Sequence, residues 1–156
     1  MTRPSYSFDV VSQKARPTMI VRARISLPQL PILIGQSLGT VVEYLGRLGE
    51  HPAGPPFVAY HNQDMADLAV EIGFPVERPL KGQGAIVAGA IPAGRHATCL
   101  FTGAYSEIGS VYEALNQWIA DHGWQVAGTT YEFYLNDPAN TRPEFLQTLI
   151  AFPLAD

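Results

Sequence analysis

The stretch GTTYEFYLNDPANTRPEFLQTLIAFPL, residues 128–154, carries the clearest structural pattern in the chain. Residues 129–135 are rich in β-branched and aromatic side chains, which favour a strand. The run Asn136-Asp137-Pro138 favours a turn, because Asn and Asp side chains bond the local backbone and Pro fixes φ. Residues 145–154 are predicted to form the returning strand. The stretch therefore predicts a β-hairpin.

One charged residue, Glu132, lies in the middle of the first strand of this hairpin. Side chains alternate along a strand, so Glu132 and Tyr134 share one face, while Tyr131, Phe133 and Leu135 share the other. A carboxylate beside a phenol on an aromatic-rich strand could form a binding site. The same pair could equally lie on the solvated face of an ordinary sheet.

Length and composition indicate one folded domain covering residues 1–156. The chain is long enough to bury a core, and its 47% hydrophobic and 15% charged residues are typical of a globular protein. The net charge is −4 and the sequence has no run of Lys or Arg. Phosphate binding requires clustered positive charge, so we expect no direct contact with nucleic acid.

The cysteine, histidine and hydropathy patterns predict a cytoplasmic protein without a metal, a cofactor or a membrane segment. Cys99 is the single cysteine, so it cannot form an internal disulfide and is expected to be a small buried apolar residue. The four histidines lack metal-ligand spacing. His96 and His122 are expected at surface or helix-terminal positions. We see no secretion signal and no apolar run of the roughly 20 residues that span a bilayer.

Hydrophobic periodicity predicts short strands and two main helices in the rest of the chain. The strands are expected at residues 8–12, 18–26, 57–61, 67–77, 85–91 and 96–102. The first helix should come after a proline-containing loop at residues 27–31, follow Gly35 and end at about residue 48. The second helix should cover residues 106–122, where Ser110 and Glu113 have the spacing of a capping box.

The two halves of the chain resemble each other. Tyr60 matches Tyr134 and Asn62 matches Asn136, both at an offset of 74 residues. Allowing four extra residues in the second loop extends the match to the strands that follow. Two such repeats are too few for a solenoid, which needs at least three.

The repeats cover about residues 18–77 and 92–154, and each has the order strand–helix–strand–strand. We therefore predict an α+β fold with pseudo-twofold repetition, an antiparallel sheet of about eight strands and two main helices. The equivalent of Glu132 in the first repeat is Val58. A carboxylate at an apolar position is costly unless it is paired, and a cationic ligand is one partner that could pair with it.

Three motifs in the second half match a known family pattern. They are Gly103-Ala104-Tyr105 before the second helix, Glu132-Phe133-Tyr134 followed by Asp137-Pro138, and a closing Thr-x-Ile-x-x-Pro with Thr148, Ile150 and Pro153 at the pattern positions. In these motifs the chain resembles the GyrI-like small-molecule-binding domain, which also serves as the effector-binding part of AraC-type and multidrug-responsive transcription regulators.

The resemblance implies a sheet carrying two helices and a pocket centred on Glu132, which would meet cationic aromatic ligands. The expected ligand-binding residues are Glu132, Tyr134, Tyr105, Tyr60, Trp118 and Phe133. We expect a stand-alone module without a helix-turn-helix domain, whose partner is a hydrophobic or cationic small molecule. Exposed edge strands would allow a homodimer.

Two other functions stay open at this stage. Some stand-alone relatives are implied to hydrolyse cyclopropane-bearing toxins, in which case Glu132 and Tyr134 would be the catalytic residues. Packing is the competing explanation for the aromatic residues, most of all for Trp118, because it lies on the apolar stripe of the second helix. A third and weaker reading is a protein-partner role such as binding gyrase.

Overall fold

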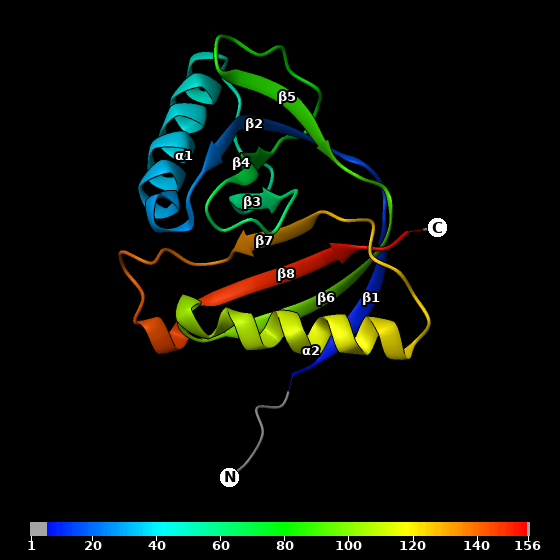
Figure 1. Cartoon of the computed structure of the whole chain (residues 1–156). Coiled ribbons are helices and arrows are strands. Elements are labelled where there is room, and N and C mark those ends of the chain that lie inside the picture. Colours follow the sequence, from blue (N-terminus) through cyan, green and yellow to red (C-terminus); the bar gives the residue numbers. More distant parts are fainter. Residues whose placement is uncertain (1–5, 156) are drawn as a thin grey trace. The chain divides into compact units, whose positions relative to one another are not determined.

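The computed structural model describes residues 6–155, which form two compact units (Figure 1). The middle unit is Lys14–Ala93, and the terminal unit combines residues 6–13 with residues 94–155.

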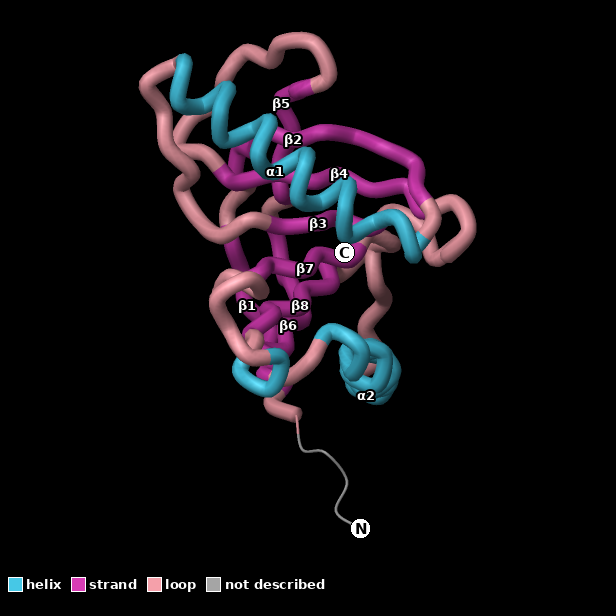
Figure 2. The backbone as a smooth tube through the Cα atoms, turned by 90° about the vertical axis from the view of Figure 1, so that its left-hand side faces the viewer, coloured by secondary structure: helices cyan, strands magenta, loops and turns pink. Residues whose placement is uncertain are grey.

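The middle unit contains four strands and one main helix. In chain order its elements are β2 (Arg16–Ile25), the 3-10 turn η1 (Leu27–Gln29), α1 (Leu30–Arg47), β3 (Phe57–Tyr60), β4 (Leu68–Pro75) and β5 (Ile86–Ile91). All neighbouring strands in it are antiparallel, in the order β3-β4-β2-β5. The helix α1 packs on β2 and β4 of this sheet (Figure 2).

The terminal unit repeats this arrangement. Its elements are β1 (Phe8–Gln13), β6 (Gly94–Thr102), η2 (Tyr105–Glu107), α2 (Ile108–Asp121), β7 (Thr130–Tyr134), η3 (Pro143–Phe145) and β8 (Gln147–Pro153). The strands are again antiparallel, in the order β7-β8-β6-β1, and α2 packs on β6.

In both units a strand is followed by a helix and then by two strands, and the first strand pairs with the last. This gives β2-α1-β3-β4 in one unit and β6-α2-β7-β8 in the other. Over the described residues, the predicted α+β class, the eight antiparallel strands and the two main helices are confirmed. The pseudo-twofold relation between the repeats stays a prediction.

The first helix begins earlier than predicted. Residues 27–31 were expected to form a loop because they contain two prolines, but α1 starts at Leu30 and Pro31 lies in its first turn. Proline is tolerated there, since the amide hydrogen it lacks would have no partner within the helix. The prediction of a loop was therefore wrong for a local, physical reason.

The predicted capping box in the second helix is also wrong. The helix α2 begins at Ile108 after η2, and its N-cap residue, Glu107, makes no hydrogen bond from its side chain. The Ser110 hydroxyl instead donates to the Glu107 carbonyl oxygen at 2.9 Å, one turn back along the helix. The sequence spacing was correct for a cap, but the helix starts before the expected cap residue.

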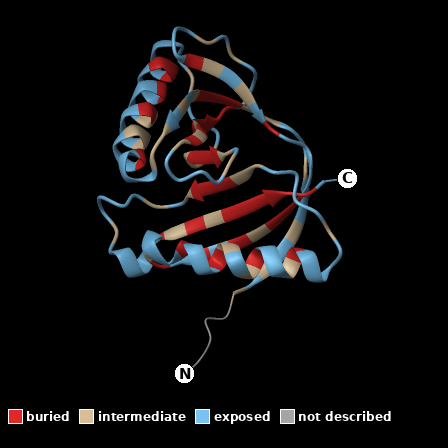
Figure 3. Cartoon of the chain, in the orientation of Figure 1, coloured by how far each residue is buried: buried red, intermediate tan, exposed pale blue. Residues whose placement is uncertain are grey.

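Each unit has its own apolar core under its helix, where the buried residues of the strands and the inner helix face meet (Figure 3). In the terminal unit the core contains Ala97, Cys99, Phe101, Ile108, Val111, Leu115, Ile119, Ile150, Phe152 and Leu154. In the middle unit it contains Met19, Val41, Tyr44, Leu45, Phe74, Val76 and Ile86. In each unit the helix therefore covers one face of the sheet and encloses the core between them.

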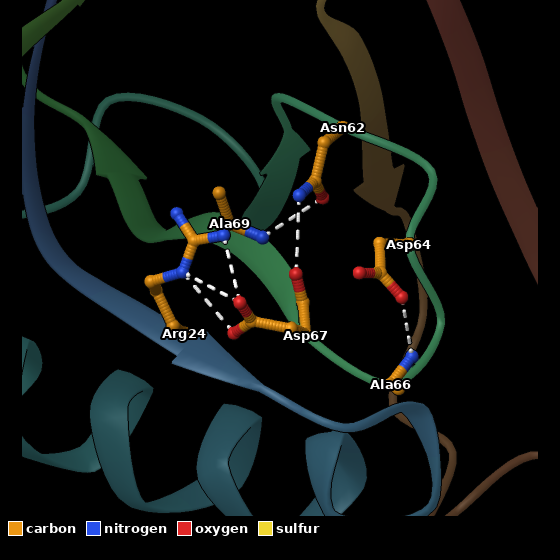
Figure 4. A network of polar contacts seen from close by, with 6 residues as sticks. All are labelled: Arg24, Asn62, Asp64, Ala66, Asp67 and Ala69. Atoms are coloured by element: carbon orange, nitrogen blue, oxygen red, sulfur yellow. Dashed lines mark hydrogen bonds and ion pairs between the residues drawn. The ribbon is translucent and has the colours of Figure 1, made fainter.

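An asparagine side chain joins the two ends of the β3–β4 connection in the middle unit. Asn62 donates to the Asp67 carbonyl oxygen at 3.1 Å and accepts from the Ala69 amide at 3.0 Å (Figure 4). The Asp67 carboxylate also accepts hydrogen bonds from the Arg24 guanidinium, with nitrogen–oxygen distances of 2.9–3.1 Å. This network holds the connection against the sheet.

The β7–β8 connection of the terminal unit is held in the same way. Asn136 donates to the Phe145 carbonyl oxygen at 3.0 Å and accepts from the Gln147 amide at 3.0 Å. Asp137 accepts from the Ala139 amide at 2.8 Å, as an Asx turn requires. The turn predicted at Asn136-Asp137-Pro138 is therefore present, and the match of Asn62 with Asn136 corresponds to a shared structural role.

Candidate functional site

The candidate site is built around Glu132, in the middle of β7. Glu132 lies opposite Ile150 of β8, which in turn lies opposite Cys99 of β6. Directly opposed residues in antiparallel strands share a face, so Glu132 lies on the helix side of the sheet with the core. Its side chain is almost fully buried, at 7% exposure. A buried carboxylate needs hydrogen-bond partners to be tolerated there.

Two tyrosines supply hydrogen bonds to this carboxylate. The Tyr134 hydroxyl donates to Oε1 of Glu132 at 2.9 Å. The Tyr112 hydroxyl, from α2, donates to Oε2. The Tyr112 ring stacks on Phe152 with the ring centroids 5.4 Å apart and an interplanar angle of 28°. Each oxygen of the carboxylate thus accepts a hydrogen bond from a tyrosine hydroxyl. One of these tyrosines, Tyr112, also packs against the core through its ring.

A third tyrosine, Tyr105, lies at the edge of this group. It belongs to η2, the short turn that leads into α2, and its ring centroid is 5.7 Å from that of Tyr134. Burial raises the pKa of the Tyr105 phenol, and the negative charges of Glu132 and Asp137 raise this pKa further. The negative charge of the Glu132 carboxylate thus adds to burial in favouring the neutral form of the Tyr105 phenol and raising its pKa. Tyr105 is still 39% exposed, so its ring contacts Tyr134 on one side and meets solvent on the other.

The hydroxyl group of Thr148 lies beside this cluster. Thr148 of β8 is opposite Tyr134 on one side and opposite Phe101 of β6 on the other. Its side chain is fully buried, at 0% exposure, and its Oγ1 has no hydrogen-bond partner among residues 6–155. Buried hydroxyl groups are normally hydrogen-bonded, so this one needs an explanation.

The middle unit has apolar residues where the terminal unit has these polar ones. In β3, Val58 lies opposite Ile72, just as Glu132 lies opposite Ile150. Both Val58 and Ile72 are completely buried. The same fold position therefore accepts a valine, and the carboxylate of Glu132 is not required by the architecture.

Of the other predicted site residues, Phe133 and Trp118 have packing contacts within the terminal unit, and Tyr60 belongs to the middle unit. Phe133 lies on the opposite face of β7, where its ring stacks on Tyr131 at 6.0 Å. Trp118 lies near the C-terminal end of α2, and the centroid of its ring is 5.5 Å from the ring centroids of both Phe8 and Trp124. Tyr60 lies in the middle unit, at the end of β3. The structure therefore groups Tyr134 and Tyr105 with Glu132, and it gives Phe133 and Trp118 packing contacts of their own.

Sequence reasoning missed Tyr112. This residue follows Val111 on α2 and lies at the edge of the buried stripe. The hydrophobic periodicity of the helix therefore did not indicate it as a site residue. Comparison of the repeats would have found it. Counted from the glycines that follow the two helices, Gly49 and Gly123, Tyr112 takes the place of Leu38. Both side chains are half-buried against their own core.

The predictions for His96 and Cys99 have opposite outcomes. His96 was expected at the surface, but it is only 2% exposed in β6, with its Nε2 3.2 Å from Nε2 of Gln13. The expectation was wrong because β6 is a central strand, with β1 and β8 on its two sides. Cys99 is a buried residue of the core, as predicted, and burial raises the pKa of its thiol.

The middle unit has an open groove on the face of its sheet that points away from α1. It is lined by Arg22, Ala23, Arg24, His61, Ala69, Val70 and Glu71. The charged groups here pair with one another. Nε2 of His61 lies 2.7 Å from Oε2 of Glu71, and Nε of Arg22 lies 3.6 Å from the same oxygen. The charged groups of this groove therefore largely neutralise one another, whereas the Glu132 carboxylate accepts hydrogen bonds from phenols.

Within residues 6–155, no group of three or more His, Cys, Asp or Glu side chains is placed to hold a metal ion. None of the helices in the same residues is long and apolar enough to cross a membrane.

Comparison with protein families identifies the class of this protein. Residues 7–155 match the model of the GyrI-like small molecule binding domain, so the chain belongs to this family. The expected resemblance is confirmed. A comparison with curated proteins found no match.

Solved structures with the same fold include regulator domains and proteins described as hydrolases. The chain superposes on the EcmrR C-terminal domain with a TM-score of 0.79 and 20% identity, covering 97% of this chain and 98% of that one. In the EcmrR–DNA complex the TM-score is 0.83 at 20% identity, and the match covers 97% of this chain but 58% of the EcmrR chain.

Two more distant structures have the same fold. A hydrolase from Listeria innocua matches with a TM-score of 0.69 and 13% identity, covering 98% of this chain and 94% of that one. SAV2435 bound to tetraphenylphosphonium matches with a TM-score of 0.63 and 10% identity, covering 96% of this chain and 94% of that one. At these identities the likeness concerns the fold alone.

Proposed function

We propose that this protein binds amphipathic, cationic aromatic molecules through a site centred on Glu132. The observation that carries the proposal is the burial of this carboxylate among tyrosines, at a position where the other unit has a valine. A small molecule is therefore the proposed partner, and we assign no direct contact with nucleic acid and no membrane role to the domain. We further propose that the whole chain is a single GyrI-like effector-binding domain.

The chemistry around Glu132 supports a cation as the ligand. A buried carboxylate attracts positive charge strongly, because the surroundings screen it less than water does. The rings of Tyr105, Tyr112 and Tyr134 provide faces on which a delocalised cation can stack. SAV2435, which has the same fold, binds tetraphenylphosphonium, a lipophilic cation with four aromatic rings. The proposal transfers this ligand class to the present chain.

A matched pair of fluorescent probes tests the proposal. At neutral pH, 9-aminoacridine is a cation and acridine is neutral, while the two ring systems are the same. We expect 9-aminoacridinium to bind with a Kd in the micromolar range, on the order of −8 kcal/mol, and acridine to bind at least about 10-fold more weakly. Equal binding of both probes, or binding of neither, would contradict the proposal.

Hydrolysis is the second candidate function, and the paired phenols of Tyr112 and Tyr134 favour it. A carboxylate can orient or deprotonate a water molecule, and a neighbouring phenol can donate a proton to a leaving group. Tyr112, which donates to the same carboxylate, joins Glu132 and Tyr134 as a candidate catalytic group. Chromatography of a cyclopropane-bearing electrophile after incubation would reveal turnover. Recovery of the compound unchanged, with wild type and with Glu132→Gln alike, would leave binding as the function.

A further inference from the structure

We propose that the Thr148 hydroxyl is a ligand-binding group, and that it selects protonated amines with an N–H donor over fully substituted cations. This inference rests on the proposed function of the same site. It begins with an unusual feature: the hydroxyl is completely buried and has no hydrogen-bond partner among the described residues. Such a group destabilises the unliganded protein, because it has lost its bonds to water without replacement.

The position of Thr148 connects it to the Glu132 carboxylate. Thr148 lies opposite Tyr134, and Ile150 lies opposite Glu132, on neighbouring strands. Thr148 and Glu132 are therefore diagonal neighbours on one face of the sheet, a geometry that typically separates Cα atoms by about 7–8 Å. A single ligand group can lie between two side chains at this spacing.

The middle unit shows that the fold does not need a hydroxyl here. Val70 lies opposite Tyr60, just as Thr148 lies opposite Tyr134. Val70 is also buried, at 2% exposure, and valine has a methyl group where threonine has its hydroxyl. The tyrosine is retained in both units, while the two valines, Val58 and Val70, are replaced by a carboxylate and a hydroxyl. Both polar replacements occur at the same site.

The neighbouring carboxylate indicates what the hydroxyl would bind. A carbonyl group of a ligand placed near Thr148 would bring its lone pairs close to the negative charge of Glu132. An ammonium or amidinium N–H has the opposite polarity, and it can donate to the Thr148 oxygen and to the Glu132 carboxylate together. A quaternary ammonium or phosphonium centre has no N–H and can satisfy the carboxylate by charge alone.

Access to Thr148 requires the aromatic rings beside it to turn. The Tyr105 ring rests on that of Tyr134, which lies next to Thr148. Tyr105 is 39% exposed and belongs to a three-residue 3-10 turn, so its ring can leave this contact without disturbing the core. We assign to Tyr105 the role of the side chain that moves when the ligand enters.

The test compares two acridine cations on three proteins. The probes are 9-aminoacridinium, which has N–H donors, and 10-methylacridinium, which has none. For Thr148→Val we expect the Kd of 9-aminoacridinium to rise about 10-fold, the scale of one charge-assisted hydrogen bond, and that of 10-methylacridinium to change less than about 2-fold. Thr148→Ser should restore most of the affinity for 9-aminoacridinium.

Thermal unfolding without ligand gives an independent readout. If the hydroxyl has no partner, Thr148→Val should keep or raise the Tm of the unliganded protein, since it removes an unsatisfied polar atom. A clear drop in Tm would show that the hydroxyl already has a structural bond, and this would overturn the inference. An equal loss of affinity for both probes, or no loss for either, would overturn it as well.

Failure of this inference can be separated from failure of the proposed function. If Thr148→Val behaves like wild type but Glu132→Gln loses both probes, the cation site stands and the selectivity assigned to Thr148 is wrong. If wild type binds neither probe, or Glu132→Gln binds both normally, the site itself is wrong and the inference falls with it.

Discussion

At the scale of single residues, the site depends on how one buried carboxylate is stabilised. Both oxygens of Glu132 accept a tyrosine hydroxyl, one from its own strand and one from α2. Hydrogen bonds to a charged group contribute more than neutral ones, particularly where water is excluded. The phenols of Tyr112 and Tyr134 therefore stabilise the buried carboxylate of Glu132 and fix its position.

Removing either phenol should destabilise the protein. We expect Tyr112→Phe and Tyr134→Phe each to lower the free energy of unfolding by about 1.5–3 kcal/mol, because each leaves the buried carboxylate with one donor fewer. Denaturant unfolding monitored by circular dichroism measures this change. The matched control is Tyr6→Phe, whose hydroxyl bonds an exposed Ser110 at 2.8 Å. It should cost less than about 0.5 kcal/mol, and equal effects for all three variants would contradict the account.

The raised pKa of Tyr105 predicts a pH dependence at the alkaline end. The phenol is held neutral by burial and by nearby negative charge, so the unfolded chain loses this proton at a lower pH than the folded protein does. Stability should therefore fall as the pH rises from the unfolded pKa, near 10, toward the higher folded pKa. Unfolding measured between neutral pH and about pH 11 should show a smaller fall for Tyr105→Phe. An identical fall in both proteins would argue against the shift.

The sequence patterns identified Glu132 and Tyr134 as site residues but not Tyr112. Glu132 was found because it breaks an apolar pattern, and Tyr134 because strand alternation puts it on the same face. Tyr112 was missed because its contact depends on how α2 docks on the sheet. Phe133 was included as a pocket residue, although the same alternation places it on the other face.

At the scale of elements, each β-strand pair that follows a helix is held by one asparagine. Asn62 and Asn136 each make two backbone hydrogen bonds at equivalent points of the two units. The sequence match of these asparagines predicted the repeat, and the reason for the match is visible only in the structure. Helix starts were harder to predict, because Pro31 was taken to exclude a helix that it in fact begins.

Substituting these asparagines should destabilise the corresponding connections. We expect Asn62→Ala and Asn136→Ala each to cost about 1–2 kcal/mol, since each leaves a backbone amide and a carbonyl without their partner. Hydrogen exchange of the Gln147 amide should rise in Asn136→Ala. The control, Asn140→Ala, removes a bond to Asp137 in an exposed loop and should cost less than about 0.5 kcal/mol. Slow exchange retained at Gln147 would contradict the assigned role.

At the scale of the whole molecule, the same order of elements carries different side chains in the two units. The middle unit fills the equivalent positions with Val58 and Val70, whereas the terminal unit has Glu132 and Thr148. Family membership sets the general class of small-molecule binding. It does not specify the ligand, which in our account follows from the polar residues that distinguish one unit from the other.

The overall charge of the protein should contribute to cation binding. The chain has a net charge of −4, so its field favours the approach of cationic ligands, and salt screens this long-range term. Raising the salt from about 0.05 M to 0.5 M should weaken 9-aminoacridinium binding by about 2- to 5-fold, since the buried contact with Glu132 is screened less than the long-range field. Fluorescence titrations at the two salt concentrations measure this change, and binding that strengthens with salt would indicate a purely apolar site.

The most direct test of the central claim is a titration of 9-aminoacridinium into wild type, Glu132→Gln and Glu71→Gln. The Glu71 variant removes a carboxylate from the open groove of the middle unit and serves as the matched control. We predict that Glu132→Gln weakens binding by about 10- to 100-fold, whereas Glu71→Gln binds like wild type. Unchanged binding in Glu132→Gln, or a loss confined to Glu71→Gln, would contradict a cation site at Glu132.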